Sequence, residues 1–509
     1  MQIEPQATAF TKRYARGEAQ VVWTTLVSDL ETPVSAFLKI AGGRPMSFLF
    51  ESVEGGAVRG RYSIIGLDPD LIWRTVNGRA EINRTARQTP DTGRDGFTPC
   101  KEEPLTALRA LIAESRIELP DALPPMSAGI FGYLGYDMVR LMEELPQPNP
   151  DPIGIPDAVL VRPTVVVVFD AVKDTLTVVT PVRPDGAVAA DTAFTRASER
   201  LSAIVDALDA PLTHSPPNVK PGPLTVWPSS NTTPAEYEKM VSVAKEYIAA
   251  GDIFQVVLAQ RFEAPFELPP FALYRALRRV NPAPFLYFLD FGGFSIAGSS
   301  PEILVRVREG TVTIRPLAGT RARGNTPQRD KALETELLAD QKERAEHLML
   351  LDLGRNDVGR VARTATVKVT DQFFVERFSQ VMHIVSNVEG QIDAKYDSLD
   401  ALAAGFPAGT VSGAPKVRAM EIIDELEKDK RGLYAGAVGY FSAAGELDSC
   451  IVLRTALIKD GTMYVQAGAG IVADSNPKSE QQECVDKAKA LFRAAEEAKR
   501  FASAARRGQ

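Results

Sequence analysis

Short runs of β-branched and apolar residues recur along the whole chain, and helical patterns do not alternate with them in a regular way. Val165–Phe169 and Leu176–Val179 are typical of two neighbouring strands, and Val256–Leu258 is typical of another. Helical patterns instead fill long separate runs, at about residues 328–353 and 477–502. A parallel sheet needs a crossover, usually a helix, between successive strands. We therefore expect an α+β fold, with large mixed, mostly antiparallel β-sheets packed together and helices on the outside.

Two proline-rich stretches indicate how the chain is divided. Its 509 residues are too many for one ordinary hydrophobic core. The stretch at residues 146–163 is expected to be a loop, because a strand pair follows it. The stretch at residues 211–234 is expected to be the main boundary. The predicted parts are an N-terminal region (1–210), a linker (211–233), a C-terminal domain (234–495) and a tail (496–509); the resemblance described below implies a regulatory role for the first and a catalytic role for the third.

A helix start follows the second boundary. Thr233 is a typical N-cap residue, and Pro234 suits the first helical position. Apolar residues then follow at helical spacing as far as Ile248, and Gly251 is typical of a helix end. The sequence therefore predicts one amphipathic helix over about residues 234–250.

Composition excludes several classes of function. The net charge of −7 argues against a nucleic-acid partner, which needs a basic surface. No apolar run reaches the ~18 residues of a membrane span, and Met1–Glu4 does not begin a typical secretory signal. The three cysteines form no CxxC pair, which suits a reducing compartment. We expect a cytoplasmic protein without a cysteine metal site.

Two pairs of glutamates stand three residues apart on the long helical runs. Glu343 and Glu346 share one helix face, and so do Glu480 and Glu483. Like charges at this spacing repel, and a magnesium ion with oxygen ligands would remove the repulsion. A solvated surface with lysines as counterions is the alternative. The spacing alone favours that alternative.

Two glycine-rich segments suit an anion-binding backbone. They cover residues 405–416 and 466–471. Glycine lets backbone N–H groups approach a ligand closely, and successive amides form a concavity for an anion. A lone GxG is more typical of a tight turn, so each segment is ambiguous by itself.

Taken in order, these segments resemble the chorismate-utilising enzymes. That family includes anthranilate synthase component I, aminodeoxychorismate synthase component I, and the isochorismate and salicylate synthases. The resemblance covers about residues 230–490, and its longest motifs are too distinctive for chance. The matching segments are GDIFQVVLAQR (251–261), GSSPE (298–302), RPLAGT (315–320), ERAEHLMLLDLGRND (343–357), VMHIVSNVEG (381–390), FPAGTVSGAPK (406–416), YAGAVGY (434–440) and QAGAGIVADSNPKSEQQE (466–483).

Two positions distinguish the branches of this family. Aminodeoxychorismate synthases typically carry a nucleophilic lysine where this chain has Ala318. Isochorismate and salicylate synthases typically carry a lysine, the general base for water, where this chain has Gln255. A site with neither lysine suits ammonia, which is already a nucleophile. The resemblance is therefore to the anthranilate synthase component I branch, which forms anthranilate and pyruvate from chorismate in tryptophan biosynthesis.

The N-terminal half resembles the same branch. Segments 48–52, 61–66 and 281–286 are similar to its LLES, RYS and NPxPYM motifs. The resemblance implies a site for tryptophan as feedback inhibitor, although the last motif has phenylalanine and leucine in place of tyrosine and methionine. A plain contact between two cores is the alternative. The residues expected to bind tryptophan are Glu51, Ser52, Pro284, Phe285 and Leu286.

The resemblance also implies roles in the catalytic domain. Magnesium would be held chiefly by Glu346 and Glu483, with Glu343 and Glu480 as direct or water-mediated ligands. Glu302 would be the general acid for the leaving 4-hydroxyl, and His383 would assist the elimination of pyruvate. Thr410 and Lys487 would complete the anionic pocket. The residues expected to contact the substrate are Gly319, Thr320, Tyr434, Arg454, Gly468, Ala469 and Gly470.

Structural explanations exist for some of these residues. His383 lies in an apolar run, where a histidine is usually a satisfied core residue, and Glu302 could cap a turn. Arg454 is harder to explain in this way, because an inward-facing arginine needs an anion. His214 and His347 are expected to be structural.

The chain offers no glutaminase motif and too few residues after 490 for a second domain of that kind. We therefore expect a separate glutamine amidotransferase subunit, in a heterotetramer with two copies of each chain. Three alternatives remain open. One is an aminodeoxyisochorismate synthase that keeps the pyruvyl group, one is aminodeoxychorismate synthase component I, and one is a non-catalytic tryptophan-binding regulatory subunit.

Overall fold

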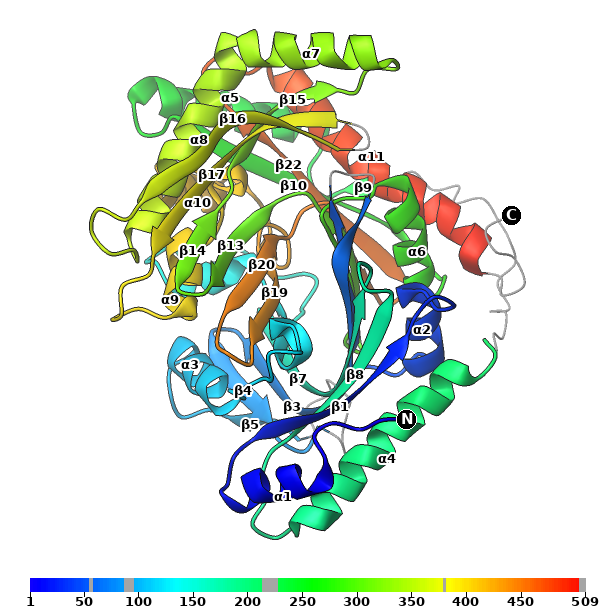
Figure 1. The fold of residues 1–509 in the computed structure, drawn as a ribbon. Coiled ribbons are helices and arrows are strands. Elements are labelled where there is room, and N and C mark those ends of the chain that lie inside the picture. The colour runs from blue at the N-terminus through cyan, green and yellow to red at the C-terminus, as the bar shows by residue number, and fades with distance from the viewer. Residues whose placement is uncertain (55–57, 87–95, 213–227, 379–380, 503–509) are drawn as a thin grey trace.

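The computed structural model describes residues 1–54, 58–86, 96–212, 228–378 and 381–502. Every strand pairing among these residues is antiparallel, and helices cover the outside of the sheets (Figure 1). The expected α+β class is confirmed. The N-terminal elements occupy the lower part of the view, and α7, α8 and α11 occupy the upper part.

The N-terminal half is built around a strongly buried strand, β7, whose residues are all buried. The strand β3 pairs along one edge of β7, while β6 and β8 share the other edge. The predicted strand pair at residues 165–179 is therefore confirmed. The elements of this half are α1 (Ala7–Ala15), β1 (Gln20–Val27), α2 (Pro33–Ile40), β2 (Ser47–Glu54), β3 (Val58–Val76), β4 (Arg79–Asn83), β5 (Thr98–Pro99), α3 (Pro104–Glu114), η1 (Pro125–Ser127), β6 (Gly129–Leu134), η2 (Tyr136–Leu141), β7 (Ala158–Asp170), β8 (Thr175–Val182) and α4 (Ala190–Asp209).

The C-terminal half contains a second set of antiparallel strands with long helices outside them. Its strands β10 and β22 form a long antiparallel pair, which runs from Val256 opposite Ile471 to Pro265 opposite Thr462. The elements are β9 (Ser229–Ser230), α5 (Pro234–Ala250), β10 (Gln255–Pro265), α6 (Pro270–Val280), β11 (Phe285–Asp290), β12 (Ser295–Ser300), β13 (Ile303–Arg308), β14 (Thr311–Ile314), β15 (Leu317–Ala322), α7 (Pro327–Ala339), α8 (Gln341–Gly359), β16 (Lys368–Arg377), β17 (Val381–Gln391), α9 (Ser398–Gly405), η3 (Gly409–Val411), β18 (Gly413–Ala414), α10 (Lys416–Leu426), β19 (Ala437–Ser442), β20 (Leu447–Ile451), β21 (Thr455–Lys459), β22 (Thr462–Ile471) and α11 (Pro477–Ala502).

Helix boundaries agree with the local signals in most places. Thr233 and Glu236 form a capping box at the start of α5, and Gly251 ends the helix with φ 84°. The run expected at about 328–353 is instead two helices, because the side chain of Asp340 accepts from the amides of Lys342 and Glu343 and begins α8 anew. The last helix reaches Ala502, so residues 496–502, assigned to a tail from the sequence, are helical.

The two halves share their sheets. In the N-terminal half, β2 pairs with β11 from the C-terminal half, and β6 pairs with β19. Strand β1 and the rest of the N-terminal set join the same connected system of strands. Most of the expected linker, at residues 213–227, lies outside the described residues. The described strands therefore place residues from both halves side by side.

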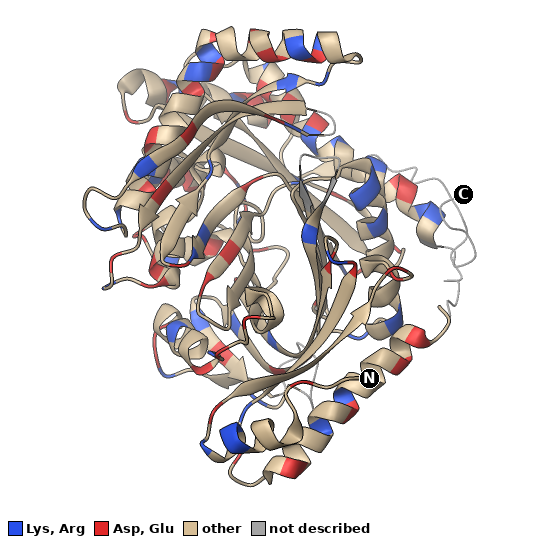
Figure 2. Cartoon of the chain, in the orientation of Figure 1, with Lys and Arg blue, Asp and Glu red and all other residues tan. Residues whose placement is uncertain are grey.

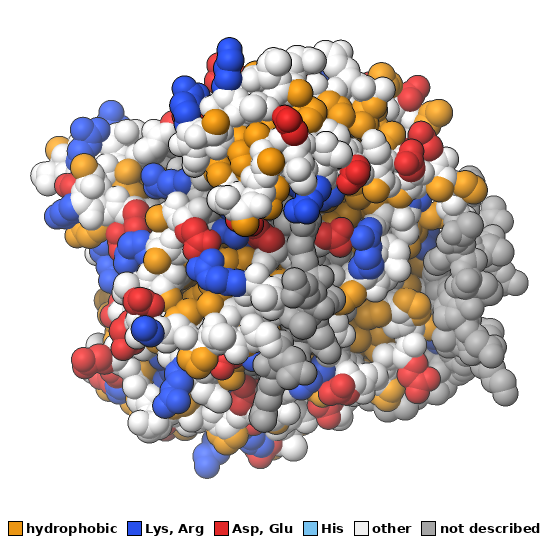
Figure 3. Space-filling model, turned by 90° about the horizontal axis from the view of Figure 1, so that it is seen from below, with side chains coloured by type: hydrophobic (Ala, Val, Ile, Leu, Met, Phe, Trp, Pro, Cys, Tyr) orange, Lys and Arg blue, Asp and Glu red, His pale blue; other side chains and the backbone are white. Residues whose placement is uncertain are grey.

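Charged side chains of both signs lie along the outer helices, and most strand positions are uncharged (Figure 2). The face seen from below also mixes acidic, basic and apolar side chains (Figure 3). Among the described residues, no helix has the length and apolar character needed to cross a bilayer.

Candidate active site

One wall of the site is the pair of strands β10 and β22, which brings the first and last motifs together. Gln255 at the start of β10 is buried, and its Nε2 donates to Oε1 of Glu346 on α8 at 3.3 Å. A Cβ added to Gly470 on β22 would lie 2.5 Å from this Nε2. Gly470 therefore leaves the space that the Gln255 side chain occupies. Among the described residues, Oε1 of Gln255 has no hydrogen-bond partner.

A second wall gathers cationic and hydroxyl groups. Nζ of Lys487 on α11 donates to the carbonyl oxygen of Gly468 at 2.8 Å. A Cβ on Gly468 would lie 2.9 Å from the hydroxyl of Tyr434, so only glycine lets this tyrosine approach. Tyr434 itself is buried, at 7% exposure. Ala469 lies between the two glycines and is fully buried.

Arg454 lines a cleft of about 690 Å³ together with Glu483 and Lys487. Its backbone has φ 48°, a left-handed conformation that side chains other than glycine rarely adopt. Within the described part of the chain no carboxylate pairs with Arg454, and burial lowers the pKa of its guanidinium. A strained, desolvated and unpaired arginine is suited to bind a carboxylate from solution.

The third wall is formed by β15 and β17. Gly319 has φ 81°, and the following residue, Thr320, faces His383 across the strand pair. Oγ1 of Thr320 lies 3.0 Å from Nδ1 of His383, and the carbonyl oxygen of Gly319 lies 3.3 Å from the same nitrogen. Ala318 is buried in β15 and pairs with Ile384.

These contacts fix the state of His383. Burial, followed by the nearby charge of Arg454, lowers the pKa of His383 to about 3, so the ring is neutral at physiological pH. The Gly319 carbonyl can only accept, which assigns the proton to Nδ1. Nε2 then carries a lone pair and has no hydrogen-bond partner in the described structure. A buried basic nitrogen without a partner is available to take a proton from a bound molecule.

Glu302 is the most perturbed acid of the site. It lies between β12 and β13 and lines a small cavity together with Thr410 of η3. Burial raises the pKa of Glu302 to about 8, although the Thr410 hydroxyl and the Leu317 amide offset part of the rise. A carboxyl group that is protonated at neutral pH and faces a cavity can serve as a general acid.

The four glutamates predicted from spacing lie in one region between α8 and α11. Burial raises the pKa of Glu346, and the charges of Glu343 and Glu483 raise it further. Burial likewise raises the pKa of Glu480, and Glu483 adds to the rise. The charges of Glu343 and Glu483 therefore disfavour ionisation of Glu346, and that of Glu483 disfavours ionisation of Glu480. The magnesium site stays a prediction.

Two of the four glutamates, Glu343 and Glu483, already pair with basic side chains of the chain. Glu343 accepts from Arg321 at 2.8 Å and from the Thr320 amide at 3.3 Å, so both of its oxygens are engaged. Glu483 is paired with Lys487 at 2.7 Å and lines the cleft. The described residues hold no group of three or more acidic, histidine or cysteine side chains that could bind an ion alone. The set fits a magnesium ion that takes one or two carboxylates and completes its shell with water and substrate oxygens.

A separate cavity of about 130 Å³ lies at the junction of the two halves, where β2 pairs with β11. Ser52 lies opposite Phe285, and Glu51 opposite Leu286, and all four line the cavity. Glu51 is already engaged by Arg278, at 2.6 and 2.8 Å. The remaining predicted residue, Pro284, precedes β11 and is not part of the lining.

Several supporting residues were not predicted from the sequence. Arg321 holds both Glu343 and Asp340. Lys416 and Asp357 form a buried ion pair at 2.9 Å that joins the FPAGTVSGAPK and DLGRND motifs, and their place at the motif ends was the available signal.

His347 is buried against Ser386 at 2.7 Å, as expected of a structural histidine. His214 lies outside the described residues.

The chain is similar to known proteins along most of its length. The model of the chorismate binding enzyme family matches residues 68–493. The chain is 56% identical over 507 residues to anthranilate synthase component 1 of Cereibacter sphaeroides, which covers 98% of this chain and 99% of that protein. It is 46% identical over 476 residues to the protein of the same name from Aquifex aeolicus, covering 93% of this chain and 94% of that one.

The chain is also similar in fold to solved structures. The crystal structure of anthranilate synthase component I from Streptococcus pneumoniae matches with a TM-score of 0.73 and 40% identity, covering 85% of this chain and 92% of that chain. The menaquinone-specific isochorismate synthase from Escherichia coli is similar in fold, with a TM-score of 0.66 and 21% identity over 96% of this chain and 100% of that chain.

Proposed function

The chain belongs to the chorismate-binding enzyme family, and from this premise we propose that it converts chorismate and ammonia to anthranilate and pyruvate as an anthranilate synthase component I. The observation that carries this proposal is the pair of buried positions Gln255 and Ala318. An amide and a methyl group replace the two lysines that other branches use as base and nucleophile. Ammonia needs neither of them.

Chorismate carries two carboxylates, and the site offers two places for them. Arg454 and Tyr434, with the amides of Gly468 to Gly470, receive the enolpyruvyl carboxylate. The unpaired guanidinium in the cleft supports this assignment, because a planar fork matches a carboxylate. The ring then lies beside Gly319 and Thr320, within reach of His383.

The reaction proceeds with the chain's own acid and base in fixed roles. The lone pair of ammonia forms the C–N bond at C2 of the ring, the ring double bonds shift, and the C4–O bond breaks. Glu302 gives its proton to the leaving hydroxyl, which departs as water. Its raised pKa of about 8 supports this role. The ammonium formed at C2 then loses a proton to solvent.

Elimination of pyruvate follows. Nε2 of His383 takes the remaining proton from C2, the electron pair forms the aromatic ring, and the C–O bond to the enolpyruvyl group breaks. The enolpyruvate is protonated to pyruvate. The neutral ring and unpartnered Nε2 of His383 support this assignment.

Magnesium is the proposed cofactor, held chiefly by Glu346 and Glu483, with Glu343 and Glu480 as direct or water-mediated ligands. When bound, it would neutralise the ring carboxylate and orient it. Glu346→Ala and Glu483→Ala should each abolish turnover, measured as anthranilate formation, because each leaves too few anionic oxygens. Glu497→Ala, further along α11, is the matched control. Near-normal rates for either site variant would reject the ligand assignment.

The numeral in the name of the relatives, component 1, supports a partner chain. We propose that the partner is a glutamine amidotransferase subunit that delivers ammonia, in a heterotetramer with two copies of each chain in the cytoplasm. Free ammonia should then replace the partner.

The cavity between β2 and β11 is the proposed site for tryptophan as feedback inhibitor. Its apolar and aromatic lining suits an aromatic side chain. Since β2 and β11 come from different halves, a ligand here would contact both halves at once.

An assay of the purified chain tests the proposal. We expect chorismate, magnesium and ammonium salts to yield the fluorescence of anthranilate without any partner chain. Consumption of chorismate without fluorescence would point to an aminodeoxyisochorismate synthase. If no chorismate is consumed, the proposed enzyme activity is wrong and a regulatory subunit remains.

A further inference from the structure

Strand β10 has an interrupted outer edge beside the active site. Its first two residues pair with the two-residue strand β18, and residues 262–263 pair with β9. Between these two short partners, the carbonyl oxygen of Val257 and the amide of Ala259 face no strand. Buried backbone groups of this kind need other partners.

A buried ion pair at the end of α10 fills this gap. Oε1 of Glu427 accepts from the Ala259 amide at 2.9 Å, and Nη2 of Arg431 donates to the Val257 carbonyl at 2.6 Å. The two side chains also bond each other through Nε of Arg431, at 2.9 Å. The Arg431 side chain is 1% exposed and the Glu427 side chain is 4% exposed, so these contacts are almost wholly shielded from water.

The same guanidinium reaches two more parts of the site. Nη1 of Arg431 donates to the carbonyl oxygen of Val411 at 2.7 Å, next to Thr410. Its central carbon lies 5.5 Å from the ring centre of Tyr434 and 4.9 Å from that of Tyr136. These distances are within the range of cation–π contacts. Arg431 thus bonds the segments that carry Thr410 and Gln255 and packs against Tyr434.

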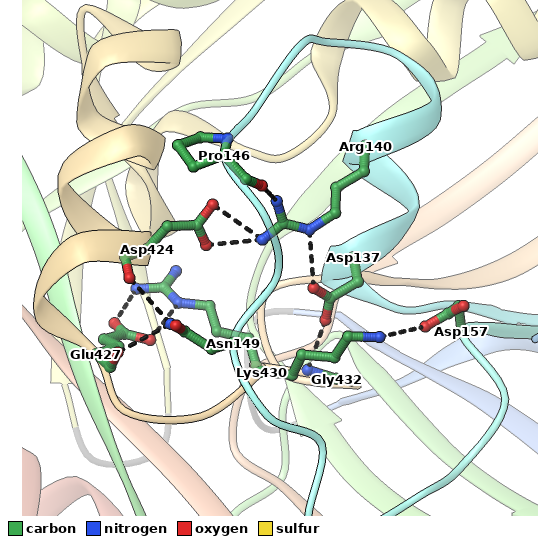
Figure 4. Close-up of polar contacts among 10 residues, drawn as sticks. Asp137, Arg140, Pro146, Asn149, Asp157, Asp424, Glu427, Lys430 and Gly432 are labelled. Atoms are coloured by element: carbon green, nitrogen blue, oxygen red, sulfur yellow. Dashed lines mark hydrogen bonds and ion pairs between the residues drawn. The ribbon is translucent and has the colours of Figure 1, made fainter. Parts of the chain in front are cut away.

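Side chains of the N-terminal half form hydrogen bonds with the backbone on both sides of this ion pair (Figure 4). Nδ2 of Asn149, in the first proline-rich stretch, donates to the backbone carbonyls of Asp424 and Glu427 at 3.0 and 2.8 Å. Oδ2 of Asp137 in η2 accepts from the Gly432 amide at 3.1 Å. Both ends of the segment 427–432 are therefore held in place.

We propose that Arg431, paired with Glu427, is a positioning residue that fixes the spacing between Gln255, Thr410 and Tyr434. This role rests on the proposed function, because Gln255 replaces the lysine of another branch, Thr410 lines the cavity of Glu302, and Tyr434 is assigned to the enolpyruvyl carboxylate. Arg431 does not touch the substrate. Its effect on turnover comes from the strand, the turn and the ring that it holds.

The test uses variants of the full chain. The double variant Glu427→Gln/Arg431→Met removes both charges together, so neither is left buried without its partner. We expect kcat/KM for chorismate to fall by about 100-fold, the size expected when reacting groups shift by about 1 Å. Arg431→Lys keeps the charge but loses the planar fork. We expect its stability to be close to that of wild type, while its kcat/KM for chorismate is as low as that of the double variant.

Arg162→Met is the matched control. Arg162 is a buried arginine on β7 in the N-terminal half, paired with Asp70 and Glu114. Its removal should lower the melting temperature while kcat/KM stays within about threefold of wild type. If Arg431→Lys recovers wild-type kcat/KM, the role of Arg431 is electrostatic and structural, and the proposal is wrong.

Hydrogen–deuterium exchange separates this proposal from the proposed function. Exchange in residues 409–414 and at Ala259 should quicken at least tenfold in the double variant, and not in Arg162→Met. This readout needs no turnover, so it applies even if the wild-type chain does not consume chorismate. Unchanged exchange in both segments would overturn the proposal.

Discussion

The raised pKa of Glu302 gives the site a pH dependence that belongs to one residue. The carboxyl group must be protonated to act as an acid, and its pKa is about 8 because it is buried. As the pH rises through 8, the protonated fraction falls and activity should fall with it. His383, with a pKa of about 3, is already neutral and adds no change in this range.

This prediction is checked with initial rates between pH 6 and 10 at a constant concentration of unprotonated ammonia. We expect kcat to decline on the alkaline side with an apparent pKa near 8. Glu302→Gln should be slower by about 10² to 10⁴, a typical contribution of a general acid, and lose this decline. An unchanged decline in that variant would assign it to another group.

Residue identity was the level at which the sequence was most informative. Gln255 and Ala318 could be interpreted before the fold was described, because the argument depends on which chemical groups are absent. Arg431 could not be found in this way. Its importance depends on a gap in the edge of β10, and no local pattern reveals which backbone groups lack a strand partner.

At the level of elements, the pairing of β2 with β11 makes a direct prediction about feedback control. Ser52 lies opposite Phe285, and its Oγ donates to the carbonyl oxygen of Tyr62 at 3.0 Å. Ser52→Phe would put a ring into the cavity and exclude tryptophan. We expect the concentration of tryptophan for half-inhibition to rise by at least tenfold, with kcat and KM for chorismate within about twofold of wild type.

The control for this variant is Thr25→Phe, which adds a phenyl ring at an exposed position on β1. It should leave inhibition by tryptophan intact. If Ser52→Phe is inhibited like the wild type, tryptophan binds elsewhere. If wild type ignores tryptophan, the phenylalanine and leucine at positions 285 and 286 have removed the response.

Local signals predicted the elements where a cap or a strong alternation was present. The N-cap residue Thr233, followed by Pro234, and the glycine at 251 gave both ends of α5. The break at Asp340 was missed, since an apolar pattern continues across it and only the cap separates α7 from α8. The pairings of β2 with β11 and of β6 with β19 join strands over two hundred residues apart, so sequence patterning carried no information about them.

At the scale of the whole molecule, the shared sheets predict a single unfolding unit. The cores of both halves meet where β2 pairs with β11 and β6 with β19, and one apolar cluster includes residues from α2, α4, α6 and α11. Heating should therefore give one cooperative transition by calorimetry, with tryptophan raising its midpoint. Two separated transitions, with only one shifted by tryptophan, would show that the halves unfold independently.

The proposed division into a regulatory and a catalytic part is not a division of the sheets, because strands of the two halves pair with one another. A ligand between β2 and β11 contacts strands of both halves, while Asn149 and Asp137 hold the segment that carries Arg431. The order of motifs along the chain did not reveal either set of contacts.

The central claim is that ammonia attacks chorismate directly in this chain and that pyruvate is then lost. The most direct measurement supplies the purified chain with chorismate, magnesium and ¹⁵N-ammonium, without glutamine, and identifies the products by mass spectrometry. The account predicts ¹⁵N-labelled anthranilate and pyruvate in equal amounts. Isochorismate, or a labelled product that keeps the enolpyruvyl group, would contradict it.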